Sequence, residues 1–484
     1  MKNLLITFVI LFASLRVGAQ PISLNPDNPH YFLYKEKPAV LITSAEHYGV
    51  VINGTPDYKR YLDVLQRYHF NLTRIFTGSY SEGEPGRQED QNTLSVRRGK
   101  LLTPWARSNV PGYVNGGNKF DLDQWDSHYF ARLKDFCKEA SKRGIVVEIA
   151  FFSANYSPSN WRNSPLNRHN NINLKEDIPY NKIYRSDYKN LIHYQLAMVR
   201  KIVQEVNEFD NVYFEICNEP YWLKGIPEVD SSIHEQQVTP EIYQWQRNIA
   251  FAVKETEQRL AKKHLIAQNF ANTYLKITNL DTNVSILNFH YAYPPKTVTD
   301  NYALNKPVSF DETSDGLNAA DRRREAWAFM MAGGAVYNNL DWSFINDDMT
   351  GIGLNTSGQH RTGKAVRNQL GVLQKAMAGF DFINAIPLDS TYKIDGMDIY
   401  GLGVKGKDYM MYWLKTAKSS PATWSFSLPG GKYMLKWMDP SNGRIMQQQI
   451  IQSKQKHINI KIPSFDKDRV LRIKRLQSFK KTKL

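Results

Sequence analysis

Eight short apolar runs, separated by segments with helical periodicity, constrain the fold of this chain more than any other feature. The runs lack polar–apolar alternation, which is typical of strands buried on both faces. Segments between them, such as 129–144 and 191–206, carry apolar residues at three- and four-residue spacing. The runs are residues 39–43, 70–76, 144–152, 211–217, 264–268, 285–291, 307–312 and 334–342. Eight strand–helix units predict a parallel (β/α)8 TIM barrel.

The pattern changes after about residue 385. Short strand-like runs then follow one another closely, with turn signals between them such as Pro429-Gly430-Gly431. This pattern predicts a C-terminal all-β sandwich domain packed on the barrel. The predicted parts are a signal peptide at 1–19, a catalytic barrel at 20–385 and a β-sandwich with a basic tail at 386–484.

The first residues have the features of a secretory signal peptide. Lys2 supplies a positive charge, residues 4–15 form an apolar core, and Val17-Gly18-Ala19 offers small residues before a cut at Gln20. The apolar core is too short for a membrane span and no second one follows, so we predict no membrane insertion. The expected location is the periplasm or the extracellular space after cleavage. Cys137 and Cys217 are expected to be buried free thiols.

The net charge of +15 reflects in part a basic C-terminal stretch. Such tails can bind nucleic acid or anionic surfaces. No nucleic-acid motif accompanies this one, so we favour a solvated terminus and predict no nucleic-acid partner. Neither HExxH nor paired-cysteine spacing nor a glycine-rich phosphate loop occurs, so we predict no metal and no cofactor. The sequence leaves the oligomeric state open.

Polar and aromatic residues gather where the predicted strands end. In a parallel barrel, chemistry is found at the carboxyl ends of the strands. The residues at or near these ends are Glu46, His47, Arg74, Asn218, Glu219, His290, Tyr291, Asp311, Glu312, Asp341 and Trp342. Such a concentration at one rim predicts a functional site there.

The motif Asn218-Glu219-Pro220 after the fourth strand, with Glu312 ending the seventh, resembles the clan A retaining glycoside hydrolases, and specifically the cellulase-like family 5 branch. Arg74 in the second strand, the sixth-strand His-Tyr pair and the eighth-strand Trp342 strengthen the resemblance, which covers roughly residues 30–385. It implies that Glu219 is the general acid/base and Glu312 the nucleophile.

The resemblance also implies roles for the neighbours. Asn218 would bind the sugar 2-hydroxyl, Arg74 and Tyr291 would hold the nucleophile, and Trp342 would floor the −1 subsite. Hydrolysis with retention of the anomeric configuration needs two carboxyl groups about 5–5.5 Å apart, one protonated and one ionised. We expect Arg74 to keep Glu312 charged and apolar surroundings to keep Glu219 protonated.

Several alternatives stay open at this point. Glu219 could instead begin a helix, with Pro220 in its first turn. Asp311 competes with Glu312, but neighbouring strand residues point to opposite sides, so one of them should enter the mouth; we favour Glu312. Glu215 shares the strand's parity with Cys217, and we predict a buried, hydrogen-bonded structural role for it.

Other predicted substrate contacts have equally plausible structural explanations. His47 and His290 could contact substrate, as could Glu46. Alternatively, the two histidines could make their hydrogen bonds to neighbouring protein groups at the rim of the barrel. Asp341 could cap the loop after the eighth strand. Aromatic side chains of the long connectors after the second and third strands could line sugar subsites, or they could pack within the connectors and stabilise them. The residues in question there are Trp105, Arg107, Tyr113, Tyr156, Trp161 and Asn167.

The sequence thus favours a secreted retaining glycoside hydrolase that cleaves O-glycosidic bonds of an oligo- or polysaccharide by double displacement. The alternative is a catalytically inactive carbohydrate-binding protein on the same scaffold, which the presence of both carboxylates disfavours. A third hypothesis, a binder of anionic polymers, rests on the basic tail and predicts a steep salt dependence of binding. The sugar, the linkage, endo or exo action and the role of the C-terminal domain remain open.

Overall fold

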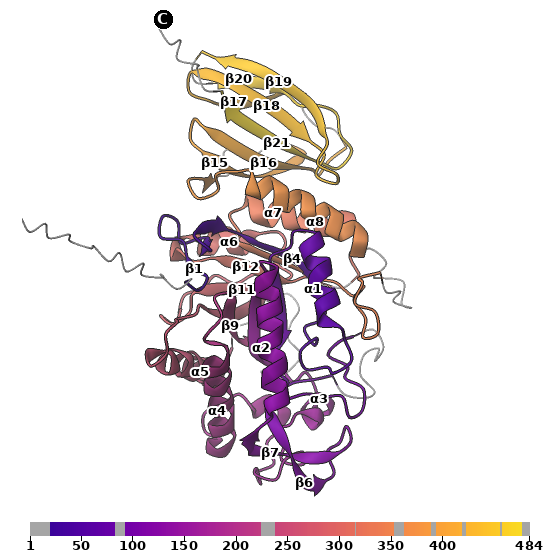
Figure 1. Cartoon of the computed structure of the whole chain (residues 1–484). Helices are drawn as coiled ribbons and strands as arrows, with labels where there is room; N and C mark the ends of the chain where they lie inside the picture. Colours follow the sequence, from indigo (N-terminus) through magenta and orange to yellow (C-terminus); the bar gives the residue numbers. More distant parts are fainter. Residues whose placement is uncertain are drawn as a thin grey trace, which may run out of the picture.

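The computed structural model is an α/β barrel with an antiparallel β module stacked against one side (Figure 1). It describes residues 20–82, 92–223, 238–314, 316–352, 363–388, 394–418, 423–454 and 457–476. The predicted signal peptide and the end of the basic tail, residues 477–484, lie outside the described residues. No helix in the described ranges combines the length and apolarity needed to cross a membrane.

All eight predicted barrel strands are present, and every neighbouring pair in the hydrogen-bonded ladder is parallel. The ladder order is β4-β13-β12-β11-β10-β9-β8-β5. The strands are β4 (Leu41–Ala45), β5 (Leu72–Phe76), β8 (Val146–Ser153), β9 (Val212–Asn218), β10 (Ile266–Asn272), β11 (Ile286–His290), β12 (Val308–Glu312) and β13 (Val336–Leu340). The predicted (β/α)8 barrel with a C-terminal β domain is confirmed.

Asn71 joins the two ends of this ladder. Its backbone precedes β5, and its side chain accepts a hydrogen bond from the Ile42 amide at 2.9 Å and donates to the Val40 carbonyl at 2.8 Å. A side-chain amide carries one donor and one acceptor side, so it can replace a missing rung between strands. The barrel is thereby closed, and its strand ends face one common rim.

Amphipathic helices cover the barrel, as their periodicity predicts. Several begin at capping side chains: Asp57, Asp126 and Asn318 each accept hydrogen bonds from backbone amides of the first turn. The connection from β10 to β11 contains no helix. The helices are α1 (Tyr58–Arg67), α2 (Ser127–Lys142), α3 (Pro158–Asn163), α4 (Lys189–Val206), α5 (Pro240–Gln258), α6 (Lys296–Asn301), α7 (Ala319–Met331) and α8 (Gly363–Ala378), with 3-10 turns η1 (Tyr180–Lys182), η2 (Pro220–Leu223) and η3 (Tyr302–Leu304).

The C-terminal module is antiparallel throughout. Its six-stranded sheet has the order β14-β15-β16-β21-β18-β19, and β17 pairs with β20 in a separate two-stranded sheet. Trp413, Trp424 and Trp437 pack together in its core. The strands are β14 (Ile386–Pro387), β15 (Met397–Val404), β16 (Asp408–Lys415), β17 (Thr423–Ser427), β18 (Gly431–Met438), β19 (Ile445–Ser453), β20 (His457–Lys461) and β21 (Asp468–Arg475).

Some strands were not predicted. The glutamine-rich β19 was missed because its apolar residues are few and half exposed. The connector after β5 contains the hairpin β6 (Trp105–Pro111) and β7 (Asn118–Trp125), and three short strands precede the barrel: β1 (Ser23–Leu24), β2 (Phe32–Tyr34) and β3 (Lys37–Ala39). The basic C-terminal stretch begins in β21, where Arg472 pairs with Asp408 at 2.7 Å.

A buried ion pair joins the module to the barrel. Arg323 of α7 donates two hydrogen bonds to Asp468 of β21, at 2.8 and 3.0 Å, and Tyr412 of β16 donates a third at 2.8 Å. All three residues are buried or nearly so. The contact fixes the module against α7, which Figure 1 shows directly beneath it.

Replacing Asp468 with Asn should therefore destabilise the whole chain. The Arg323 guanidinium would stay buried without its counter-charge, which typically costs about 3–5 kcal/mol. Urea unfolding followed by tryptophan fluorescence measures the change in midpoint. An Asp381→Asn variant is the matched control, because Asp381 is exposed and contacts Asn384 nearby. Equal midpoints for the two variants would contradict a structural role for the pair.

Candidate active site

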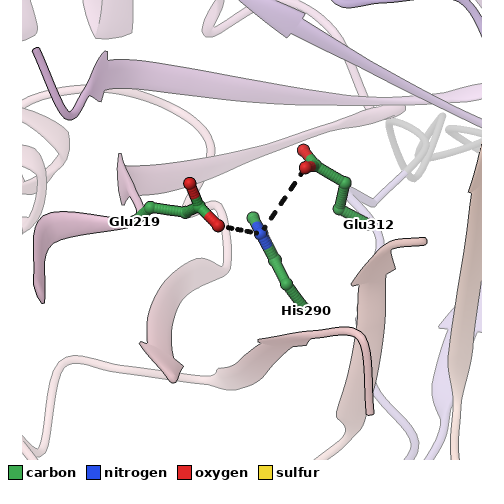
Figure 2. Close-up of side chains that lie close together, drawn as sticks. All are labelled: Glu219, His290 and Glu312. Atoms are coloured by element: carbon green, nitrogen blue, oxygen red, sulfur yellow. Dashed lines mark hydrogen bonds and ion pairs between the residues drawn. The ribbon is translucent and has the colours of Figure 1, made fainter. Parts of the chain in front are cut away.

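Two glutamates and a histidine meet at the carboxyl ends of the barrel strands (Figure 2). Glu219 follows β9, His290 ends β11 and Glu312 ends β12. His290 Nδ1 lies 3.1 Å from Glu219 Oε1 and 3.9 Å from Glu312 Oε1. One carboxylate oxygen of each glutamate lies within 4.8 Å of one of the other. The two carboxyl groups therefore face each other across the imidazole.

The backbone is strained at this place. Glu219 and Tyr291 adopt φ values of 49° and 52°, in the left-handed region that non-glycine residues rarely visit. The turn at Glu219 redirects the chain from β9 into η2, and the amide of Glu219 donates to Asn269 on β10 at 3.3 Å. Strain of this kind persists where the surrounding structure holds it, and it clusters at functional sites.

Arg74 organises the floor of the site. It is fully buried and donates to Glu215 at 2.6 Å, to Asn218 at 2.8 Å and to Glu312 at 3.4 Å. The Tyr291 hydroxyl donates to Glu312 at 3.0 Å. Glu312 thus receives donors from both residues that the sequence predicted beside it. The predicted buried, hydrogen-bonded state of Glu215 is confirmed.

A β-bulge explains why Asp311 and Glu312 both lie on the inner side. Phe289 pairs with Phe310 but His290 pairs with Glu312, so Asp311 is an extra residue in β12. Asp311 is fully buried and contacts Arg74 at 3.4 Å. The expectation that strand alternation would send one of these two side chains outward is wrong. Glu312 nonetheless faces Glu219, whereas Asp311 lies within the barrel.

The predicted residues of the first and eighth strand ends divide into two groups. The rings of His47 and Trp342 pack edge to face at 4.3 Å, and His47 lies 3.8 Å from Glu82. Glu46 is fully buried and binds its own loop, accepting hydrogen bonds from the amides of Gly49 and Val50 and the hydroxyl of Thr93. The structure does not bring Glu46 to the paired glutamates, and we interpret it as a structural residue.

Asp341 is also structural. It accepts hydrogen bonds from the Ser343 amide at 3.1 Å and from Ser44 at 2.8 Å, and it pairs with Arg367 at 2.5 Å. The alternative that it caps the loop after the eighth strand is therefore confirmed. The Arg367 pair additionally ties this loop to α8.

Tyr156, from the connector after β8, completes the site. Its hydroxyl donates to Glu219 Oε2 at 2.7 Å and accepts from Asn218 Nδ2 at 2.8 Å. Tyr156 is 40% exposed, as is the neighbouring Trp222. Sequence reasoning named Tyr156 as a possible subsite ring but gave no sign of these hydrogen bonds, because loop conformation decides which connector side chain reaches the strand ends.

The other connector residues mostly hold the loops together. Trp105, Tyr113, Trp161 and Asn167 are buried. Arg107 stacks on Phe120 at 3.9 Å and on Tyr113, and it donates to the Asn118 carbonyl at 2.8 Å. Of the connector residues considered above, Tyr156 is the one that the structure brings to the paired glutamates.

Some solved structures of glycoside hydrolases share this architecture. A Bacteroides vulgatus protein assigned as a glycoside hydrolase matches 94% of this chain and 82% of its own, with a TM-score of 0.65 and 13% identity. A family 5 glycoside hydrolase from the same organism matches 94% of this chain and 93% of its own, with a TM-score of 0.59 and 12% identity. The chain shares their fold. No protein-family model and no curated protein sequence matches the chain.

The ionisation of the two glutamates runs opposite to the expectation from sequence. Burial opposes the charge of Glu219, but hydrogen bonds from His290 and Tyr156 outweigh it and lower its pKa. Burial raises the pKa of Glu312, and the nearby charge of Glu219 adds to this rise. Arg74 opposes this rise without cancelling it, because its closest contacts are with Glu215 and Asn218. Glu219 is therefore the more acidic of the pair in the free protein.

His290 adds a second positive charge to the site beside that of Arg74. Burial lowers its pKa, but the carboxylates of Glu312, Asp311 and Glu219 more than compensate and raise it to about 10. A protonated imidazole has no free lone pair for a cation. The cluster of Glu148, Glu215 and Asp311 also has the spacing of a metal site, but Arg74 already contacts two of its members. We assign a metal to neither group.

Proposed function

We propose that this chain is a retaining glycoside hydrolase that cleaves O-glycosidic bonds of an oligo- or polysaccharide. The observation that carries the proposal is that one carboxylate oxygen of Glu219 lies within 4.8 Å of one of Glu312, at the carboxyl ends of β9 and β12. Retaining enzymes hold their two carboxyl groups about 5–5.5 Å apart, whereas inverting enzymes need about 6.5–9.5 Å for an intervening water.

In this proposal Glu312 attacks the anomeric carbon while Glu219 protonates the departing oxygen. A glycosyl ester on Glu312 forms, and Glu219 then takes a proton from the water that hydrolyses it. Because Glu219 is the more acidic group in the free protein, it must gain a proton when the sugar binds. His290 Nδ1 lies 3.1 Å from Glu219 Oε1, within hydrogen-bonding distance, so a protonated His290 can give its proton to that carboxylate.

Two exposed rings support a glycan substrate. Tyr156 and Trp222 lie at 6.4 Å between ring centroids, beside Glu219. Aromatic faces offer apolar area to the C–H faces of sugars. Because they flank the proposed acid, we place them on the leaving-group side, where a second sugar unit would lie.

A screen for turnover tests the proposal. Aryl glycosides that differ in the sugar are assayed for phenol release, and plant and microbial polysaccharides for new reducing ends. Proton NMR of the first product identifies the anomer, and retention is expected. Tight glycan binding without turnover of any substrate would instead favour the inactive carbohydrate-binding protein, and an inverted product would contradict the double displacement.

We further infer that the chain is exported, on the basis of its N-terminal sequence. Expression of the full chain in a Gram-negative host, followed by mass spectrometry of the periplasmic and extracellular fractions, should find a mature protein that begins at Gln20. Retention of residues 1–19 on a cytoplasmic product would contradict export.

Replacing Tyr156 with Phe is expected to move the acid limb of the kcat/KM–pH profile to higher pH. The hydroxyl donates to the Glu219 carboxylate and lowers its pKa, so its loss raises that pKa, and the acid limb follows the more acidic carboxyl group of the pair. A hydrogen bond to a charged group corresponds to a shift of about 1 pH unit. Tyr194→Phe, on the outer helix α4, is the control. A limb that moves to lower pH would contradict the assignment.

A further inference from the structure

A second layer of carboxyl groups lies beneath the paired glutamates. Glu148 of β8, Glu215 of β9 and Asp311 of β12 are fully buried, and one oxygen of each lies within 4.8 Å of the others. Arg74 contacts Glu215 at 2.6 Å and Asp311 at 3.4 Å. Three buried carboxyl groups around one guanidinium would leave uncompensated negative charge if all were ionised, which is costly inside a protein.

The hydrogen bonds indicate which group carries a proton. The donors that reach Glu148 within the described part of the chain are neutral: the Tyr213 hydroxyl at 2.8 Å and the Asn288 amide at 2.8 Å. Burial raises the pKa of Glu148 well above its usual value, and the charges of Asp311 and Glu215 add to the rise. Glu148 is therefore the neutral carboxylic acid of the layer.

Asp311 is the member that reaches the site above. Its Oδ2 accepts from Asn288 at 3.0 Å, the same amide that binds Glu148, and lies 3.6 Å from His290 Nε2. Burial opposes its charge, but Arg74 and His290 outweigh this and lower its pKa. The other nitrogen of His290 faces Glu219. The contacts thus run from Glu148 through Asp311 and His290 to the paired glutamates.

We propose that Asp311 is a positioning residue, whose carboxylate orients the His290 imidazole and keeps it protonated between Glu219 and Glu312. The bulge in β12 gives Asp311 this place, because it puts one extra residue inside the barrel directly before Glu312. The charged and titratable groups that face Asp311 or His290 are Tyr48, Arg74, Glu148, Tyr213, Glu215, Glu219, Tyr291 and Glu312. Arg74 is the cation among these, so the charge on His290 depends on the carboxylates around it.

The inference deepens the proposed function and rests on it for its meaning, but its test does not need a substrate. The imidazole resonances of His290 are followed by NMR against pH in labelled wild type, Asp311→Asn and Glu148→Gln. In the wild type His290 should stay protonated well above neutral pH, with a midpoint of about 10. In D311N the midpoint should fall by about 1–3 pH units, because an opposite charge within 4–6 Å is lost.

Glu148→Gln is the matched variant. Glutamine replaces a neutral acid by a neutral amide of the same shape, so the midpoint of His290 should stay near that of the wild type. The resonances of His264, which pairs with Glu257 elsewhere in the chain, should not change in either variant. A neutral His290 at pH 7 in the wild type would overturn the proposal even if D311N does not fold. An equal fall of the midpoint in E148Q and D311N would also overturn it.

Kinetics then separate this inference from the proposed function. With the substrate found in the screen, D311N should lower kcat by about 10- to 100-fold with little change in KM, the size of effect that loss of a supporting carboxylate typically has. A lowered His290 midpoint in a chain that hydrolyses no glycoside would support the role of Asp311 and contradict the function. A D311N variant with wild-type kcat and an unshifted midpoint would contradict the positioning role alone.

Discussion

Replacing Glu312 with Gln is expected to abolish hydrolysis of every glycoside, whatever its leaving group. An amide oxygen does not form the glycosyl ester that the double displacement requires, so the first step fails even when departure needs no acid. Loss of a nucleophile typically lowers kcat by on the order of 10⁴- to 10⁶-fold. Initial rates on an aryl glycoside with a poor leaving group and on its dinitrophenyl counterpart measure the loss.

The control for this variant is Glu205→Gln. Glu205 lies on the outer helix α4, where it pairs with Lys134 and Lys201. Its replacement makes the same change from carboxylate to amide, but far from the strand ends. Both variants should unfold near the wild-type temperature, because Gln keeps the shape that Tyr291 contacts. A Glu312→Gln variant that releases dinitrophenol at the wild-type rate would remove Glu312 from the reaction.

The barrel could be predicted from sequence because each strand is buried on both faces. A run such as 144–152 is apolar apart from Glu148, and this pattern survives in the sequence whatever the neighbouring loops do. The edge strand β19 left no such pattern, since one of its faces is open and it carries four glutamines. A strand buried on both faces leaves a clear apolar pattern in the sequence, whereas a half-exposed strand leaves a weak one.

The positions of the paired glutamates could also be predicted, since strand ends of a parallel barrel share one rim. What the sequence could not give is the direction of each side chain near an irregularity. Asp311 was expected to point away from Glu312, and the bulge places both inside. The bulge depends on the pairing of β12 with β11, which lies in the tertiary structure and not in the local sequence.

The ionisation of the site depends on contacts that are still farther apart in the chain. Arg74 was expected to lower the pKa of Glu312 strongly. It also contacts Glu215, Asn218 and Asp311, so it lowers the pKa of Glu312 less. Tyr156 reaches Glu219 from a loop. A shared cation and a loop hydroxyl both change a pKa, and neither can be placed before the fold is known.

Replacing Glu219 with Gln is expected to affect substrates unequally, in contrast to the change at Glu312. Glycosides with poor leaving groups need a proton as the bond breaks, so their hydrolysis should slow by about 10²- to 10⁴-fold. A dinitrophenyl glycoside departs without that proton, so its first step should be nearly spared. The second step lacks its base, however, and the glycosyl ester on Glu312 should accumulate.

Stopped-flow release of dinitrophenol from E219Q should therefore show a burst close to one equivalent, followed by slow turnover, and mass spectrometry should find the chain with one added sugar. Glu312→Gln should show neither. The two variants together decide the roles, which matters here because Glu219 is the more acidic group in the free protein. A burst from the Glu312 variant and none from the Glu219 variant would exchange the acid and the nucleophile, and full activity of E219Q on an unactivated glycan would exclude Glu219 as the acid.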